Sequence, residues 1–263
     1  MKVVLFCGGM GMRLKEYSEN IPKPMVEIGY RPLLWHVMKY YAHYGHNDFI
    51  LCLGYKADVI KNYFLNYNEC LSNDFALGKG LKEPILLNTD VTDWSITFVD
   101  TGLNSNIGQR LMAIREHLEG EDMFLANYAD GLTDLPLPDM IDHFHKQKKV
   151  ASFYSVKPNL SFHAVTFSMD EKISGIKPIR QSDFWINGGY FILRKEIFDY
   201  IKKGEELVEQ PFQRLLTKNK LTTFKHDGFW AGMDTFKDKV MFDELYREGS
   251  PPWMVWNGKK AAE

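Results

Sequence analysis

The chain has 263 residues, and its 32 basic and 34 acidic side chains leave a formal charge of −2. Hydrophobic residues make up 45% and charged residues 25%, which is typical of soluble globular domains and excludes a disordered chain. Because there is neither a basic excess nor an apolar run of about 18 residues, composition argues against a nucleic-acid partner and against a membrane span.

Strand and helix signals alternate through the first 150 residues. Short apolar runs predict strands, and apolar residues three or four apart predict helices. We expect strands over 3–7, 49–53, 95–99 and 123–127, and helices over about 32–45, 59–67, 107–118 and 138–146. Residues 70–93 are weakly periodic and predict only loops or short strands. The alternation predicts an α/β fold with a Rossmann-like mixed, mostly parallel sheet and helices on both faces.

The pattern changes beyond residue 150. Short β-like pieces at 151–156, 165–167 and 189–193 precede helical pieces at 212–217 and 235–246. No repeat or obvious linker divides the chain. We therefore expect one domain over 1–263, with a first half to about residue 150 and a small accessory β/α part over about 151–263.

The cysteines and the amino terminus bear on location. Cys7, Cys52 and Cys70 are too few and too scattered for a disulfide framework. The apolar stretch at the amino terminus is also too short for a secretory signal. These features predict a reduced, cytoplasmic protein in which Cys7 and Cys52 are small core residues.

A glycine-rich segment directly follows the first predicted strand. Gly8, Gly9 and Gly11 allow a sharp turn with exposed backbone N–H groups, which suits a phosphate or a base, and Arg13 adds a cation. Leu14 stands where a dinucleotide fingerprint needs its third glycine, which argues against a nicotinamide-dependent oxidoreductase. A bare glycine turn is the alternative.

Lys23 stands between Pro22 and Pro24. The two prolines predict a stiffened, extended backbone, which would aim the lysine ammonium at a fixed point.

Together these runs resemble the sugar-1-phosphate nucleotidylyltransferases, in particular the glucose-1-phosphate cytidylyltransferase branch. The likeness begins with Gly-Gly-x-Gly-x-Arg-Leu and Pro-Lys-Pro-Met and extends to about residue 256. Further matching segments follow in the family's order, at 23–29, 54–56, 99–102, 108–111, 128–131, 186–189 and 229–235.

The resemblance implies transfer of a nucleotidyl group from CTP, or another nucleoside triphosphate, to a sugar 1-phosphate. Backbone N–H groups of the glycine segment would hold the nucleotide, and Arg13 and Lys23 would act on the phosphates as catalytic residues. Thr101, Gly102 and Arg110 would lie beside the base and triphosphate. The resemblance also implies a homo-oligomer. From position alone, Arg110 has the alternative of an exposed cation in the first turn of a helix.

Two carboxylates are candidate metal ligands. By resemblance, Asp130 and Asp234 bind Mg²⁺, and Asp130 also belongs to the nucleotide site; Mg²⁺ prefers carboxylate, water and phosphate oxygens. Each residue has a structural alternative. Asp130 precedes a glycine, as turn residues do, and Asp234 precedes Thr235 where a helix N-cap is expected.

The sugar side carries the departures from the family pattern. The resemblance implies that Lys177 holds the sugar phosphate and that Asn187, Gly188 and His163 lie around the sugar. His163 replaces a glycine, and Ile176 replaces a glutamate that accepts hydrogen bonds from sugar hydroxyls. We therefore hypothesise that the sugar is not plain glucose.

Two further departures lie on the nucleotide side. Met12 replaces a hydroxyl residue of the glycine segment, and Ala129 replaces a glycine, a change expected to be minor. A catalytically degenerate binding or regulatory protein is the alternative function.

Aromatic residues make up 14% of the chain. By resemblance, several of them line the sugar end of the pocket: Phe162, Phe184, Trp185, Tyr190, Phe229 and Trp230. The aromatic run at 251–256 predicts either packing within the subunit or a subunit contact.

Overall fold

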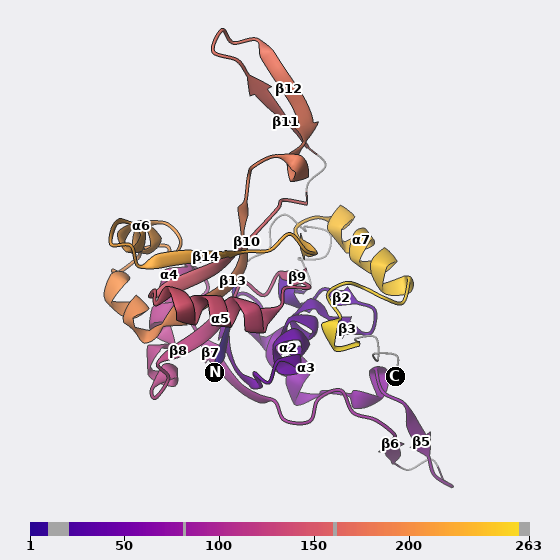
Figure 1. Cartoon of the computed structure of the whole chain (residues 1–263). Coiled ribbons are helices and arrows are strands. Elements are labelled where there is room, and N and C mark those ends of the chain that lie inside the picture. Colours follow the sequence, from indigo (N-terminus) through magenta and orange to yellow (C-terminus); the bar gives the residue numbers. More distant parts are fainter. Residues whose placement is uncertain (10–20, 81–82, 160–161, 258–263) are drawn as a thin grey trace.

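The computed structural model describes residues 1–9, 21–80, 83–159 and 162–257 (Figure 1). Its main sheet contains seven strands, in the spatial order β14 (Leu221–Lys225), β10 (Ala151–Val156), β13 (Ile186–Arg194), β8 (Met123–Asn127), β1 (Val3–Phe6), β4 (Asp48–Leu53) and β7 (Ser95–Asp100).

Six of these strands run in one direction. β8, β1, β4 and β7 pair in parallel, and β14 pairs in parallel with β10. β13 is antiparallel to both of its neighbours, β8 and β10. The mostly parallel sheet predicted from the sequence is confirmed.

Helices cover both faces of the sheet, as the sequence predicts. Their bounds are α2 (Leu33–His43), α3 (Ala57–Leu65), α4 (Ile107–Ala113), α5 (Leu137–Gln147), α6 (Gln210–Thr217) and α7 (Phe236–Arg247). Val3 and Leu5 belong to one buried cluster with residues of α2, α3, α5 and α7. Val4 and Phe6 belong to the other, with residues of α4 and α6. Strand β1 is therefore apolar throughout because both of its faces are covered.

The helix expected over 107–118 is shorter than predicted. α4 ends at Ala113, and a 3-10 turn over Arg115–Leu118 continues the chain. Leu111, Ile114 and Leu118 are all buried, so the spacing of the buried residues fits either structure.

The second half of the chain completes the main sheet. β13 pairs with β8 from the first half, and β10 and β14 extend the sheet beyond it. β14 escaped prediction because Thr222 and Thr223 break the apolar pattern of an edge strand. The boundary near residue 150 stays a prediction.

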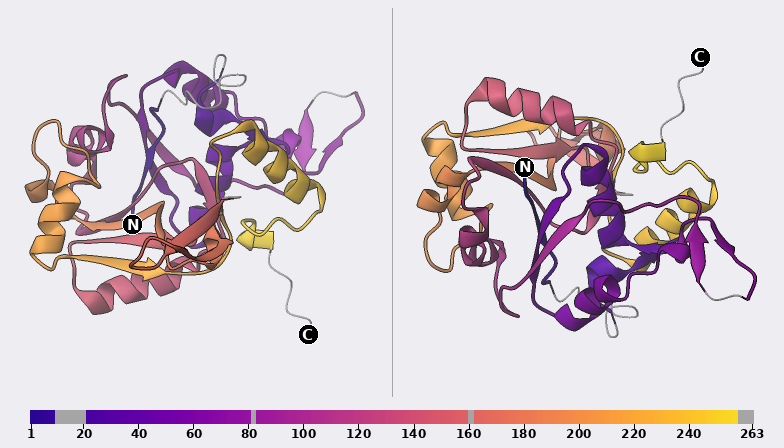
Figure 2. Two further views of the ribbon diagram at one scale, coloured as in Figure 1. Left: turned by 90° about the horizontal axis from the view of Figure 1, so that it is seen from above. Right: turned by 90° about the horizontal axis from the view of Figure 1, so that it is seen from below.

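Four two-stranded sheets complete the described part of the fold. Three are hairpins: β2 (Glu27–Ile28) with β3 (Arg31–Pro32), β5 (Phe75–Leu77) with β6 (Pro84–Leu86), and β11 (His163–Phe167) with β12 (Ile173–Pro178). The fourth pairs two strands remote in the chain, β9 (Gly131–Thr133) and β15 (Trp230–Gly232). Figure 1 shows β11–β12 projecting from the body, and Figures 1 and 2 show β5–β6 standing clear of it. The piece expected at 165–167 therefore lies in a projecting hairpin, outside the main sheet.

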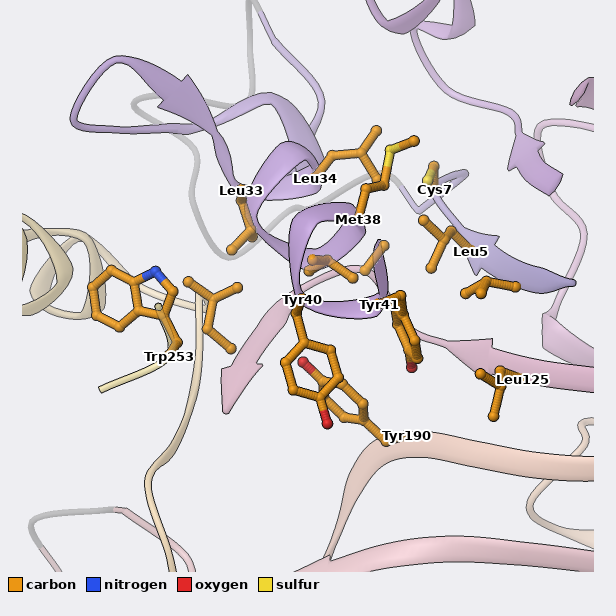
Figure 3. Close-up of a cluster of buried hydrophobic side chains, with 14 of the residues drawn as sticks. Leu5, Cys7, Leu33, Leu34, Met38, Tyr40, Tyr41, Leu125, Tyr190 and Trp253 are labelled. Atoms are coloured by element: carbon orange, nitrogen blue, oxygen red, sulfur yellow. The ribbon is translucent and has the colours of Figure 1, made fainter. Parts of the chain in front are cut away.

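Tyrosine rings form the centre of the core below α2 (Figure 3). Tyr190 packs against Tyr40 and Tyr41, with ring centroids 5.6 and 5.9 Å away. Its hydroxyl donates to the Gly131 carbonyl at 2.9 Å. Tyr190 is 1% exposed, so its expected place in a sugar-facing wall is wrong; it packs inside and supports the turn above it.

The aromatic segment at 251–256 packs on its own subunit. Trp253 is buried, and its indole N–H donates to Nδ1 of His36 at 3.4 Å. The ring of Trp256 meets Trp35 edge-on, with centroids 6.0 Å apart. Packing within the subunit is therefore the observed alternative.

Two other sequence predictions concern burial. Cys7 and Cys52 are both buried, as expected of core residues, and burial raises the pKa of each thiol. Within the described ranges, every helix is too short or too polar to cross a membrane.

Candidate active site at the carboxyl edge of the sheet

The candidate residues of the first half gather at one edge of the sheet. β8, β1, β4 and β7 are parallel, so their carboxyl ends lie together. Gly8, Gly54, Thr101 and Asp130 follow these strands. In open α/β sheets this is the edge at which ligands bind.

Lys23, Asp130 and Asp234 meet at this edge. The Lys23 ammonium donates to Asp130 Oδ2 at 2.9 Å and to Asp234 Oδ1 at 2.6 Å. Asp130 lies 107 residues and Asp234 lies 211 residues after Lys23. The antiparallel pairing of β9 with β15 brings the carboxylates together, since Gly131 pairs with Gly232 and Met233 N–H donates to the Asp130 carbonyl at 2.8 Å.

The backbone at Lys23 differs from the prediction. Lys23 begins a 3-10 turn over Lys23–Met25, and only Pro22 before it is extended. The Met25 N–H donates to the Pro22 carbonyl at 2.8 Å and closes this turn. Pro24 fits because proline is tolerated in the first turn of a helix. The lysine is still held on a stiff segment.

The electrostatics of the cluster keep the ammonium charged. Burial on its own lowers the pKa of Lys23, but the Asp130 and Asp234 carboxylates outweigh it and raise that pKa. The Lys23 side chain is 14% exposed, against 38% and 45% for the two carboxylates. Both acids therefore keep part of their surface open to solvent or ligand.

The donor set fits a magnesium ion. Asp130 and Asp234 share one partner atom, so their oxygens face the same point. Mg²⁺ is usually held by one or two carboxylates, with waters and substrate phosphates completing its shell. Among the described residues no group of three or more His, Cys, Asp or Glu side chains could hold a metal ion. Further ligands would then come from substrate and water.

A tight turn presents Asp130. Its predecessor Ala129 has φ of 58°, and Asn127 Oδ1 accepts the Ala129 N–H at 2.6 Å. A β-carbon on left-handed backbone costs about 1–2 kcal/mol. Ala129 therefore carries backbone strain that a glycine at this position would not. Asp130 is a turn residue as well as a candidate ligand.

The beginning of α7 presents Asp234. Thr235, and not Asp234, is the N-cap, so the N-cap alternative for Asp234 is wrong. Asp238 Oδ2 accepts from the backbone N–H groups of Asp234 and Thr235 at 3.0 and 2.7 Å. The sequence analysis missed Asp238, although Thr-x-x-Asp is a spacing typical of a capping box.

Arg110 connects the ends of three strands next to Gly8. It lies in the last turn of α4 and is 3% exposed, so the exposed-cation alternative is wrong. Its guanidinium donates to the carbonyls of Gly8 and Leu53, each at 3.0 Å, and to Thr101 Oγ1 at 2.7 Å. It thereby joins the carboxyl ends of β1, β4 and β7. A nucleotide contact of Arg110 stays a prediction.

The glycines around Arg110 have distinct roles. A β-carbon on Gly8 would lie 2.1 Å from Arg110 Nη1, so this position must be glycine while the guanidinium is there. Gly102 has φ of 92° and donates its N–H to Asp100 Oδ1 at 3.0 Å. Among the described residues, nothing lies within 4 Å of a β-carbon placed on Gly9. The remaining nucleotide-side predictions, Gly11, Met12 and Arg13, lie outside the described residues.

Asn187 and Gly188 lie where β13 begins. Asn187 Nδ2 donates to the Tyr128 hydroxyl at 3.3 Å, and Trp230 Nε1 donates to the Gly188 carbonyl at 2.8 Å. A β-carbon on Gly188 would lie 2.6 Å from the Tyr154 ring. Tyr128 begins the matching segment 128–131, but the sequence assigns it no role.

His163 and Lys177 lie at the root of the projecting hairpin. His163 pairs with Pro178, and Ala164 pairs with Lys177. Within the described residues no hydrogen bond joins either side chain to the Lys23 cluster. Their sugar-binding roles stay predictions.

Comparison with known proteins decides the family. A family model described as nucleotidyl transferase matches residues 2–242. The chain belongs to the nucleotidyl transferase family. Glucose-1-phosphate cytidylyltransferases of Salmonella typhi and Salmonella typhimurium are each 38% identical over 258 residues, which cover 97% of this chain and 100% of theirs. This nucleotidyl transferase is thus cytidylyltransferase-like, as its motifs predict.

Solved structures support the fold of this nucleotidyl transferase. A UTP-bound UGPase from Acinetobacter baumannii matches with a TM-score of 0.68 at 18% identity, over 97% of this chain and 96% of that one. At this identity the likeness concerns the fold alone.

Proposed function

We propose that this nucleotidyl transferase transfers CMP from CTP to a sugar 1-phosphate and releases pyrophosphate. The observation that carries the proposal is the meeting of Lys23, Asp130 and Asp234 from three remote segments at the carboxyl edge of the sheet. The proposed preference for cytidine is supported by the 38% identity with two glucose-1-phosphate cytidylyltransferases.

The reaction needs no nucleophilic side chain. An oxygen of the sugar phosphate forms a bond to the α-phosphorus of CTP, and the bond from that phosphorus to the bridging oxygen breaks. Pyrophosphate leaves with the electron pair. The protein has to align the two phosphates and to stabilise the negative charge that shifts between them.

We assign the charge stabilisation to Lys23. Its side chain is largely buried, and its ammonium is held at the carboxylate pair by two short hydrogen bonds. A fixed cation in a partly desolvated site stabilises developing charge without reorganising during the reaction. When bound at Asp130 and Asp234, Mg²⁺ would neutralise triphosphate charge. Arg13, on the glycine segment, is proposed as a second cation on the phosphates.

The geometry disfavours the catalytically degenerate alternative. A protein that only bound nucleotide would not require two carboxylates and a lysine directed at one point. We also keep the hypothesis that the preferred sugar phosphate is not plain glucose 1-phosphate, because His163 and Ile176 depart from the family on the sugar side.

Pyrophosphate release tests the proposal. We would measure it with CTP, UTP, dTTP, ATP and GTP, each against a panel of sugar 1-phosphates with Mg²⁺. Activity with CTP and at least one sugar 1-phosphate is expected, and no release from any pair would favour the binding protein.

A matched pair of variants tests whether the activity depends on the group formed by Lys23, Asp130 and Asp234. Asp234→Asn should lower kcat/KM by at least about 100-fold. Asp243→Asn, on the helix α7 that begins just after Asp234 and paired with Lys239, should stay within about twofold of the native enzyme. Equal losses in both variants would contradict the assignment of Asp234.

A further inference from the structure

A second group of cations lies farther along the carboxyl edge. β10 ends at Val156 and β14 ends at Lys225, and these parallel strands end side by side. Lys157 directly follows β10. Trp185 directly precedes β13, which runs the other way and therefore begins at the same edge. Lys157, Trp185 and Lys225 are named here the lysine–tryptophan cluster.

Both lysines of the cluster lie against one indole. Lys157 Nζ is 4.5 Å and Lys225 Nζ is 5.3 Å from the centroid of the Trp185 ring. Lys157 Nζ also donates to the Ser182 carbonyl, which fixes its position. Both long side chains therefore contact the same indole, which stabilises each ammonium by a cation–π interaction.

The acidic side chains beside the cluster leave its charge in place. Asp227 is paired with Arg180 at 3.1 Å. Asp183 is exposed, and within the described residues it forms no ion pair with either lysine. Two ammonium groups that share one indole, with no carboxylate partner among the described residues, attract an anion.

The beginning of β13 connects the cluster with the turn that carries Asp130. In the sheet order, one strand, β13, separates β10 from β8, which leads to Asp130. β8 ends opposite Tyr190 of β13, whereas β10 ends four residues farther along it, opposite Ile186. The turn after Asp130 bridges this offset, because a β-carbon on Gly131 would lie 3.3 Å from the Trp230 indole nitrogen, which donates to the Gly188 carbonyl. Gly188 is three residues, about 10 Å of extended strand, from Trp185. Trp230, whose indole N–H holds the Gly188 carbonyl, lies on β15 immediately before the turn to Asp234.

We propose that the lysine–tryptophan cluster forms the far end of the sugar site and binds a second oxyanion, a carboxylate or a phosphate, on the sugar 1-phosphate. This inference rests on the proposed function. The preferred substrate is then a sugar 1-phosphate that carries negative charge at both ends.

Substrate competition tests this with the full-length enzyme, CTP and Mg²⁺. We would compare kcat/KM for glucose 1-phosphate, glucuronic acid 1-phosphate and glucose 1,6-bisphosphate. At least one doubly charged sugar should be preferred about tenfold, and the two charged sugars distinguish a carboxylate from a phosphate. Equal values for all three would overturn the inference, whereas no turnover of any sugar phosphate would instead overturn the proposed function.

Variants locate the preference. In the double variant Lys157→Met, Lys225→Met the preference ratio should fall to about one. The matched control is Lys218→Met, Lys220→Met, because these lysines lie against Tyr200, with Lys220 just before the amino end of β14. The control should keep the native ratio. A ratio retained in the first variant would refute the assignment.

A binding measurement covers the case in which the double variant fails to fold. Titration of the native enzyme with glucose 1,6-bisphosphate should change its tryptophan fluorescence, and Trp185→Phe should abolish most of that change. An unaltered response in Trp185→Phe would place the second anion elsewhere.

Discussion

Two cations at the same edge of the sheet are held in opposite ways. Arg110 is almost completely buried and donates to backbone carbonyls and a hydroxyl at the ends of three strands. Lys23 donates to two carboxylates that are more than a third exposed. The partners of Arg110 belong to the framework, whereas those of Lys23 remain open to ligands. Substitution of Arg110 should therefore lower the stability of the fold, whereas substitution of Lys23 should lower the rate of turnover.

The largest expected effect is on stability. Arg110→Met should lower the free energy of unfolding by about 3–5 kcal/mol, since it leaves buried carbonyls unpaired. Arg110→Lys should restore little, because an ammonium cannot reach several carbonyls as the guanidinium fork does. Urea unfolding measures both. A loss below about 1 kcal/mol for Arg110→Met would remove the contrast with Lys23.

Lys23→Met should lower turnover strongly and leave stability almost unchanged. We expect kcat/KM to fall by at least about 100-fold, because a fixed charge at the reacting phosphates is lost. The free energy of unfolding should change by about 1 kcal/mol or less, since the carboxylates are partly solvated. Steady-state kinetics and urea unfolding on the same preparation give both numbers. Near-native turnover would show that Lys23 is not a catalytic residue.

The buried imidazole of His36 should make the stability of the protein depend on pH. Burial lowers the pKa of His36 to about 4, and its Nε2 contacts the Ile28 carbonyl at 3.0 Å. The unfolded chain takes up this proton first, so stability should fall by about 3 kcal/mol as pH drops from 6.5 towards 4. The difference between native enzyme and His36→Gln in unfolding experiments across that range isolates the effect. Parallel pH curves would contradict it.

Asp238 tests whether the carboxylate pair needs its own support. Thr235→Ala and Asp238→Ala should each cost about 1 kcal/mol through loss of the α7 cap. Only Asp238→Ala also frees the Asp234 N–H, so only that variant should raise the Mg²⁺ concentration for half-maximal pyrophosphate release. Thermal shift with and without Mg²⁺ gives a second readout. Identical Mg²⁺ curves would reduce Asp238 to a helix cap.

The smallest effect is expected at Ala129. Replacement by glycine relieves left-handed strain but removes a buried methyl group, and the opposing contributions are each about 1 kcal/mol. Ala129→Gly should therefore unfold within about 1 kcal/mol of the native enzyme. Ala129→Val should be clearly less stable, because a branched side chain tolerates positive φ worst.

The sequence predicts the elements whose cause is local. The apolar run Val3–Phe6 becomes β1, and the spacing of Leu34, Met38 and Tyr41 is that of α2. The same holds for the candidate ligands, since the motifs single out Lys23, Asp130 and Asp234. Their convergence rests on β9–β15, two three-residue strands too short to leave a pattern.

What the sequence does not predict depends on distant partners. The position of Arg110 in a helix predicts an exposed side chain. The side chain is buried because the ends of three strands converge on it. The resemblance predicts Tyr190 in the wall of the sugar pocket, but its ring packs against Tyr40 and Tyr41 in the core. Hairpin β11–β12 carries apolar residues that predict burial, yet Val165, Phe167 and Ile173 are exposed on a projecting arm.

The long separations that define the site also bear on how the chain is made. During synthesis β8 emerges well before β13, its neighbour in the sheet, so the growing chain holds an open, apolar strand edge for some 60 residues. Lys23 meets its second carboxylate only when residue 234 has left the ribosome. Chains truncated before β13 should therefore aggregate, and expression of this enzyme should depend on chaperones that shield strand edges.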